Sequence, residues 1–101
     1  MPAYIIVEID ITDPVRYDRY RQLAAPTIPL YDGRYLARGG PTEPLEGTWQ
    51  PKRLVILEFP NSDRARAWWS SPEYAPAKAL RYECARSEML LVEGLPSGVT
   101  A

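Results

Sequence analysis

Residues 3–11 show the two-residue alternation of a β-strand, because branched apolar side chains occupy every second position. Weaker alternation predicts further strands over residues 34–38, 52–59 and 88–93. Apolar and aromatic side chains at helical spacing predict one helix over residues 14–25 and a second helical region, in two pieces, up to residue 85. Short strands thus alternate with helices along the whole chain.

Capping and breaking residues mark the ends of these elements. Thr12-Asp13-Pro14 places a capping side chain before a proline at the first helical position, where its missing N–H costs nothing. Asp32-Gly33 turns the chain into the second strand. Asn61 or Ser62 can cap the next helix, and Ser71-Pro72 breaks that helix in two.

The order β-α-β-β-α-β predicts an α+β domain of the ferredoxin-like type. Because crossover connections are right-handed, we expect a four-stranded antiparallel sheet with the first and third strands central and the helices on one face. The domain is expected to span residues 1–95, with a flexible C-terminal tail over residues 96–101. Residues 39–51 are too rich in glycine and proline for regular structure, and we interpret them as a flap over a functional site.

The two faces of the predicted sheet differ in composition. One face is uniformly apolar and should be covered by the helices; it carries Ile5, Val7, Ile9, Val55, Leu57 and Phe59. By strand parity, the other face mixes apolar and charged side chains, namely Tyr4, Ile6, Glu8, Asp10, Arg34, Leu36, Arg38, Leu54, Ile56, Glu58, Met89, Leu91 and Glu93. That face is too apolar for water and too charged for a dry core. We therefore expect a second copy to cover it around a polar-lined cavity, in a homodimer.

Composition narrows the range of partners. The 101 residues include 12 basic and 13 acidic side chains, without the excess of positive charge that nucleic-acid-binding proteins use. The chain has neither a run of about 18 apolar residues nor a basic and then apolar N-terminal segment. We therefore expect a cytoplasmic protein that binds neither nucleic acid nor membranes.

The sequence contains no histidine and a single cysteine, Cys84. Imidazole is the base or ligand in Ser-His-Asp and Cys-His catalytic arrangements, in His-ligated haem and in most catalytic zinc sites. We therefore expect no metal, haem or other cofactor, and any chemistry must rely on Asp, Glu, Tyr, Arg or Lys. Cys84 is expected to be a small buried helix residue.

Arg38 and Asp10 are candidates for a ligand site beneath the flap. Parity places both on the face without helices, toward the same end of the sheet, where a guanidinium can bind a carboxylate or an enolate. Asp10 and the flap residue Glu46 are candidates for proton transfer, and Trp49 can close over a ligand. A structural interpretation is equally open, in which Arg38 only neutralises Asp10 across the sheet.

The glycines of the flap also allow two interpretations. Gly39 and Gly40 either turn the chain at the strand end or let a ligand approach backbone N–H groups. Trp49 is likewise either a packing anchor or a platform for a ligand.

Pairing of the second and third strands determines which side chains share a face. If Arg38 lies opposite Leu54 in a hairpin, Arg34 lies opposite Glu58 and the two form a cross-strand ion pair.

The aromatic residues of the helices are expected mostly in the core. Tyr17, Tyr20 and Tyr74 lie at helical spacings that indicate packing, although a tyrosine hydroxyl in a cavity can also act as an acid or a donor. Trp68 and Trp69 are adjacent and point about 100° apart, so one should be buried while the other lines an interface.

Several short motifs, taken together, resemble one bacterial family of proteins of about this length, a domain of unknown function in the dimeric α+β barrel superfamily. The motifs are Thr12-Asp13-Pro14, Gly33-Arg34-Tyr35-Leu36, Arg38-Gly39-Gly40, Leu45-Glu46-Gly47, Trp49-Gln50-Pro51, Arg53 with Glu58-Phe59-Pro60, and Trp69-Ser70-Ser71-Pro72-Glu73-Tyr74. The resemblance covers nearly the whole chain and implies the fold and a dimer, but no reaction. Arg53 joins Arg38, Gly39, Gly40 and Trp49 as a ligand-binding candidate.

That superfamily includes cofactor-free monooxygenases, muconolactone-type isomerases, chlorite-dismutase-like haem proteins and ligand-sensing domains. Two classes of function therefore stay open. The first is a cofactor-free enzyme that acts by proton transfer on a small anionic or aromatic molecule. The second is a non-catalytic or stress-related module that only binds such a molecule, and the fold alone does not choose between them.

Overall fold

The computed structural model describes residues 1–96 and contains every predicted element. In chain order these are β1 (Ala3–Ile11), α1 (Pro14–Ala24), two 3-10 turns (Ala25–Thr27 and Pro29–Tyr31), β2 (Arg34–Arg38), β3 (Leu54–Phe59), α2 (Ser62–Trp69), α3 (Ala75–Cys84) and β4 (Ala85–Glu93). The third strand begins two residues later than predicted, and the fourth begins three residues earlier. Of the predicted flexible tail, residues 97–101 lie outside the described part of the chain.

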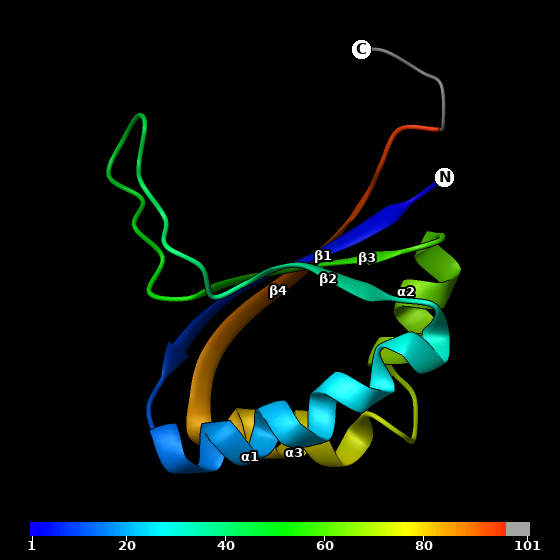
Figure 1. The fold of residues 1–101 in the computed structure, drawn as a ribbon, viewed down its shortest axis with the longest axis horizontal. Coiled ribbons are helices and arrows are strands. Elements are labelled where there is room, and N and C mark those ends of the chain that lie inside the picture. Colours follow the sequence, from blue (N-terminus) through cyan, green and yellow to red (C-terminus); the bar gives the residue numbers. More distant parts are fainter. Residues whose placement is uncertain (97–101) are drawn as a thin grey trace.

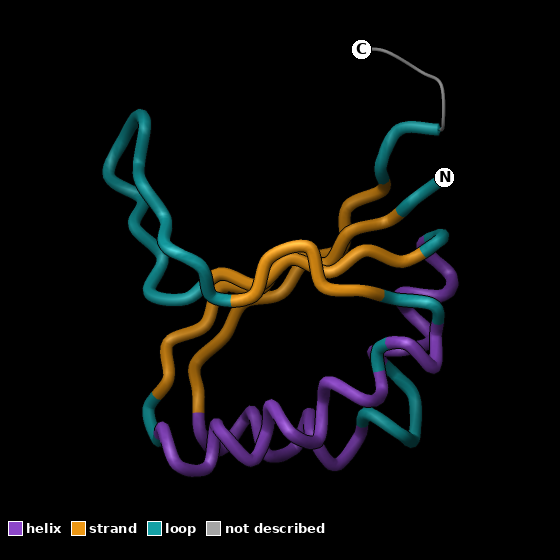
Figure 2. The backbone as a smooth tube through the Cα atoms, in the orientation of Figure 1, coloured by secondary structure: helices purple, strands orange, loops and turns teal. Residues whose placement is uncertain are grey.

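The four strands form one antiparallel sheet in the order β2-β3-β1-β4, so β1 and β3 are central, as the topology predicts. All three helices lie on one side of the sheet (Figure 1). The loop between β2 and β3, the N-terminus and residues 94–96 extend toward the other side (Figure 2). The sheet therefore has a helix face and an open face. Within residues 1–96, no helix combines the length and the hydropathy that crossing a bilayer requires.

Side-chain caps start the first two helices where the sequence indicates. The Asp13 carboxylate accepts a hydrogen bond from the backbone N–H of Arg16, and Pro14 follows at the first helical position. The Asn61 side chain caps α2 in the same way by accepting from the backbone N–H of Arg64. These contacts satisfy N–H groups that a helix start leaves without partners.

The core lies between the helices and the apolar sheet face predicted to carry them. It includes Ile5, Val7, Ile9, Val55, Leu57, Phe59, Tyr17, Tyr20, Trp68, Tyr74 and Cys84, all buried. The Trp68 ring packs 5.6 Å from the Phe59 ring and 4.1 Å from the Tyr74 ring, measured between centroids. The three predicted core tyrosines and the buried cysteine are thus confirmed. Of the two adjacent tryptophans, Trp68 is buried and Trp69 is exposed.

A β-bulge in β2 corrects the predicted face of Arg38. Arg34 pairs with Glu58 as predicted, and its Nε donates to the carboxylate at 2.7 Å. The register then shifts between Tyr35 and Ala37, so Arg38 lies opposite Val55 instead of Leu54. Because one extra residue reverses strand parity, Arg38 lies on the helix face, and the prediction that it faces the same side as Asp10 is wrong.

The register of β4 corrects a second predicted face. Leu91 pairs with Ile5 and Met89 pairs with Val7, so both side chains lie on the helix face, and Glu93 shares their parity. The residues of β4 on the open face are Arg86, Glu88, Leu90 and Val92. Residues 89–92 are apolar throughout, so their alternation alone does not distinguish the two faces.

Residues 39–53 form no helix or strand, and residues 39–51, the predicted flap, project from the sheet on the side of the open face (Figure 1). We call residues 39–51 the flap. The indole N–H of Trp49 donates to the Glu8 carboxylate at 3.3 Å, and the Gln50 amide donates to the Thr42 hydroxyl at 3.1 Å. Trp49 itself is 61% exposed, so its ring leaves a large apolar surface beside the open face.

Gly33, the residue before β2, packs tightly against the core. A Cβ atom at Gly33 would lie 2.5 Å from Cε1 of Phe59 and 2.9 Å from Cγ2 of Ile28, both fully enclosed side chains, whereas one at Gly40 would meet nothing. We predict that Gly33→Ala lowers the free energy of unfolding by about 1–3 kcal/mol, because a packed core resists added volume. Gly40→Ala should change it by less than about 0.5 kcal/mol. Urea titrations of both variants check this, and equal midpoints would contradict the packing described.

Candidate functional site

Neither of the two predicted catalytic carboxylates lies on the helix face of the sheet. Asp10 lies in a groove at the β1–β4 end of the open face, and its carboxylate pairs with the Lys52 ammonium at 3.4 Å. Glu46 is exposed within the flap. The structure brings neither carboxylate to Arg38, so the interpretation in which Arg38 neutralises Asp10 is wrong.

The predicted ligand-binding residues divide between the two faces. Arg38 and Arg53 line a narrow cavity on the helix side, next to Gly39, whereas Trp49 lies beside the open face. Gly40 is exposed with open space around its Cα atom. The single site predicted beneath the flap is therefore not assembled in one protomer.

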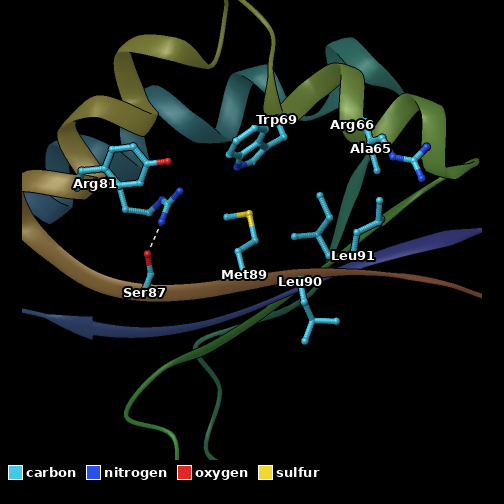
Figure 3. Close-up of a pocket in the computed structure, with 10 residues that line it drawn as sticks. Ala65, Arg66, Trp69, Arg81, Ser87, Met89, Leu90 and Leu91 are labelled. Carbon is cyan, nitrogen blue, oxygen red and sulfur yellow. Dashed lines mark hydrogen bonds between the residues drawn. The ribbon is translucent and has the colours of Figure 1, made fainter.

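A larger cavity, of about 360 Å³, lies between β4 and the helices α2 and α3. We call it the β4 pocket (Figure 3). Its wall is mainly apolar and is formed by Ile5, Ala65, Trp69, Met89 and Leu91. Trp69 reaches into it from α2, and Met89 and Leu91 rise from β4, whereas Leu90 points to the opposite side of the sheet (Figure 3). Its size and apolar wall are typical of pockets for small organic molecules.

Two arginines line this pocket: Arg66 is exposed and pairs with Asp63, whereas Arg81 is buried. The Arg81 side chain extends from α3 toward β4, and its Nη1 donates to the Ser87 hydroxyl (Figure 3). Its Nε donates to the Tyr74 hydroxyl at 3.4 Å, and that hydroxyl lies 2.9 Å from the hydroxyl of Tyr20. Tyr20, Tyr74, Arg81 and Ser87 thus form one buried chain of polar groups, whose members come from α1, the start of α3, α3 itself and β4.

Arg81 is buried without a counter-charge. Only 3% of the residue is exposed, and within residues 1–96 no acidic side chain forms an ion pair with it. Its third nitrogen, Nη2, makes no hydrogen bond to a described residue. A buried charge of this kind is costly unless it is paired, so the pocket is chemically suited to an anion.

The surroundings keep the Arg81 guanidinium charged and the Tyr20 hydroxyl neutral. Burial lowers the pKa of the Arg81 guanidinium, but the contact with Tyr74 outweighs it and leaves that pKa above its usual value. Burial, followed by the nearby Tyr74, raises the pKa of Tyr20. At neutral pH Arg81 is therefore a cation and the Tyr20 hydroxyl is neutral, so Arg81 can donate hydrogen bonds to an anion.

Sequence reasoning did not select Arg81, although the sequence contains a signal for it. Tyr74, Ala77, Arg81 and Cys84 recur at the spacing of one helix face, and all four are buried. A charged residue inside an otherwise buried stripe is unusual, because arginine is rarely buried without a partner. That exception marks Arg81 as a functional candidate.

No metal-binding cluster is evident in the described part of the chain. Within residues 1–96, acidic and cysteine side chains form no group of three that could hold an ion. The β4 pocket is lined by hydroxyl, guanidinium, indole and thioether groups, which do not resemble a transition-metal ligand set.

Comparison with known proteins identifies the family. A family model described as a domain of unknown function (DUF1330) matches residues 2–95. The chain belongs to the DUF1330 family. No curated protein matches the sequence of this DUF1330 chain. Its family and its ferredoxin-like fold agree with those that the sequence motifs implied.

Solved structures share the fold at low sequence identity. A protein of unknown function from Rhodopseudomonas palustris is 16% identical, with a TM-score of 0.74 over 94% of this chain and 83% of that chain. SnoaB, a cofactor-independent oxygenase from Streptomyces nogalater, is 11% identical, with a TM-score of 0.64 over 96% of each chain. A dimeric ferredoxin-like protein of unknown function from Jannaschia sp. CCS1 is 17% identical, with a TM-score of 0.62 over 95% of this chain and all of that chain.

We predict that Arg81→Met keeps or increases stability in protein free of small molecules. Methionine preserves most of the apolar volume and removes the unpaired charge, so the free energy of unfolding should stay equal or rise by up to about 2 kcal/mol. Tyr74 keeps its contact with Tyr20. Urea titration checks this. A loss of more than about 2 kcal/mol would show instead that the guanidinium is needed for folding.

Proposed function

We propose that the protein binds a small amphipathic monoanion, an aromatic or branched carboxylate, in the β4 pocket. The observation that carries the proposal is Arg81, a buried arginine with no acidic partner among residues 1–96, which faces a cavity with an apolar wall. The anionic group would pair with the guanidinium, and the apolar part would lie against Trp69, Met89 and Leu91. A charge-assisted hydrogen bond from a buried guanidinium is strong.

The hydrogen bonds of the Arg81 guanidinium support a carboxylate ligand. Tyr74 and Ser87 hold Nε and Nη1, so these two contacts orient the group. Nη2 is left to donate to a ligand, and Nη1 retains a second N–H. A planar acceptor with two oxygens matches that edge better than a single point charge does.

The residues that line the helix-side cavities favour binding of a ligand over removal of a proton from it. No carboxylate lines either helix-side cavity within residues 1–96, and the sequence contains no histidine. The raised pKa of Tyr20 makes its hydroxyl a poor base. Asp10 and Glu46 stay predicted proton-transfer groups for a site on the open face.

A cofactor-free enzyme is the second candidate, and the same arginine favours it. A buried cation lowers the pKa of a bound phenol or enol, so Arg81 would stabilise an anion that the substrate itself forms. SnoaB, which shares the fold, is described as a cofactor-independent oxygenase. Its identity to this chain is 11%, so its activity serves here only as a comparison.

The ligand prediction is tested by thermal denaturation with a panel of phenylacetate, indole-3-acetate, benzoate and their neutral amides. The carboxylates should raise the melting temperature of the wild type, and the amides should not. Arg81→Met should abolish the shift, and Arg81→Lys should weaken binding at least about tenfold, because an ammonium cannot form the two-pronged contact. Arg19→Met, an exposed site, is the control with the same charge change. Shifts that survive in Arg81→Met would refute the proposal.

We also propose a homodimer formed through the open face. Ile56, Ile6 and Leu90 form an apolar row across β3, β1 and β4, and Leu90 and Val92 are 58% and 41% exposed in the single chain. The flap and the segment after β4 rise on either side of this row (Figure 2). Two structural neighbours, from Jannaschia sp. CCS1 and Bacteroides fragilis, are described as dimeric.

Sedimentation equilibrium at micromolar concentration should give twice the 11.5 kDa mass of the chain. Leu90→Glu should shift the protein to the monomer, because a carboxylate in the centre of an apolar interface stays unpaired. Val15→Glu changes an exposed apolar residue on α1 and should leave the dimer intact. A wild type that sediments at the mass of one chain would exclude the dimer.

A further inference from the structure

A second cavity on the helix side, separate from the β4 pocket, is surrounded by positive charge. It lies between α1 and the β2–β3 half of the sheet and has a volume of about 30 Å³. Arg21 reaches it from α1, Arg38 from the end of β2, and Arg53 from the residue before β3. Met89 is the single residue that lines both cavities. We call this second site the three-arginine cavity.

These arginines have few partners of opposite charge. Arg21 pairs with Asp18 on its own helix. Within residues 1–96, no acidic side chain forms an ion pair with Arg38 or Arg53, and none lines the cavity. The Nε atom of Arg53 is buried and has no hydrogen-bond partner among residues 1–96. Like charges gathered at one opening repel each other, and a buried donor without an acceptor is costly, so an anion bound among the three arginines would be stabilising.

Aromatic rings and a glycine hold two of the guanidinium groups in place. The Cζ atom of Arg38 lies 4.3 Å from the centre of the Tyr35 ring, and that of Arg53 lies 5.6 Å from the Tyr17 ring. Gly39 has a φ of +74°, and a Cβ atom there would lie 2.1 Å from Nη1 of Arg53. The guanidinium of Arg53 therefore lies directly across a backbone position that only glycine fits well.

We propose that the three-arginine cavity is a binding site for a dianionic phosphoryl group, such as the phosphate of a monoester. Two guanidinium groups without acidic partners match a doubly charged oxyanion, whose several oxygens can accept from both. The cavity is too small for more than the head group, so the organic part of the ligand lies outside, beside the exposed side chains of Arg21 and Arg38. The neutral hydroxyl groups of Tyr17 and Tyr35 line the same wall.

This site and the proposed carboxylate pocket use different arginines, although Met89 lines both. Arg81 does not line the three-arginine cavity, and none of its three arginines lines the β4 pocket. Loss of one site therefore leaves the other testable in the same protein.

The test is titration calorimetry of the full chain with inorganic phosphate at pH 8, in a chloride buffer of constant ionic strength. We expect saturable binding to the wild type, weakened at least tenfold in Arg38→Met and in Arg53→Met. Arg34→Met removes the same charge from the open face and should bind like the wild type. Arg81→Met should also bind like the wild type, whatever the outcome for carboxylates.

Two results would overturn the site. One is binding that Arg38→Met leaves unchanged, and the other is a heat signal that Arg34→Met reduces as much as Arg38→Met does, which would indicate general attraction to positive charge. If Arg53→Met does not fold, the exposed Arg38 still decides the matter. Gly39→Ala gives a further check, because displacement of the Arg53 guanidinium should weaken phosphate binding to a similar extent.

Discussion

Tyr74 is completely buried at the start of α3, and its hydroxyl contacts both Tyr20 of α1 and Arg81 of α3. Its ring packs against Trp68, whose indole N–H donates to the Thr27 hydroxyl at 2.9 Å. Each of these polar groups is buried, so each needs its partner in a fixed position. The requirement sets the distance between α1 and α3 and holds the Arg81 side chain between α3 and β4. The contact of Arg81 with Ser87 links α3 to β4 at one side of the β4 pocket.

The fold was predictable from local signals that agree with one another. The alternation over residues 3–11 and the caps at Asp13 and Asn61 correspond directly to elements of the structure. The cross-strand pair of Arg34 and Glu58 also follows from sequence, because the residues at that end of the hairpin pair in simple register. Agreement between propensity, pattern and capping is what makes a sequence specify one fold.

The candidate site was less predictable, because a shift of one residue in strand pairing moves a side chain to the other face of the sheet. One bulge between Tyr35 and Ala37 reverses the face of Arg38, and the choice of parity in residues 89–92 moves Leu91 to the core and Leu90 to the open face. The hydrogen-bond pairing of the strands determines on which face Arg38 and Leu91 lie. In a short strand, or in one that is apolar throughout, the side-chain pattern does not predict that pairing. Arg53 and Gly39 lie near Arg38, on the side of the sheet opposite to the one predicted for Arg38.

The distribution of charge explains why the two faces would serve different purposes. The chain has nearly equal numbers of acidic and basic residues, yet within residues 1–96 the acids Glu8, Asp10 and Glu58 occupy the open face while neither helix-side cavity has an acid. A buried arginine without an acidic partner among residues 1–96, as Arg81 is, opposes folding, so a sequence selected for stability alone would replace it with an apolar residue. Each cavity is lined by residues of an edge strand, β2 or β4, and by the helices. A dimer formed through the open face would therefore leave both cavities uncovered, which separates the surface that joins two chains from the surfaces that receive anions.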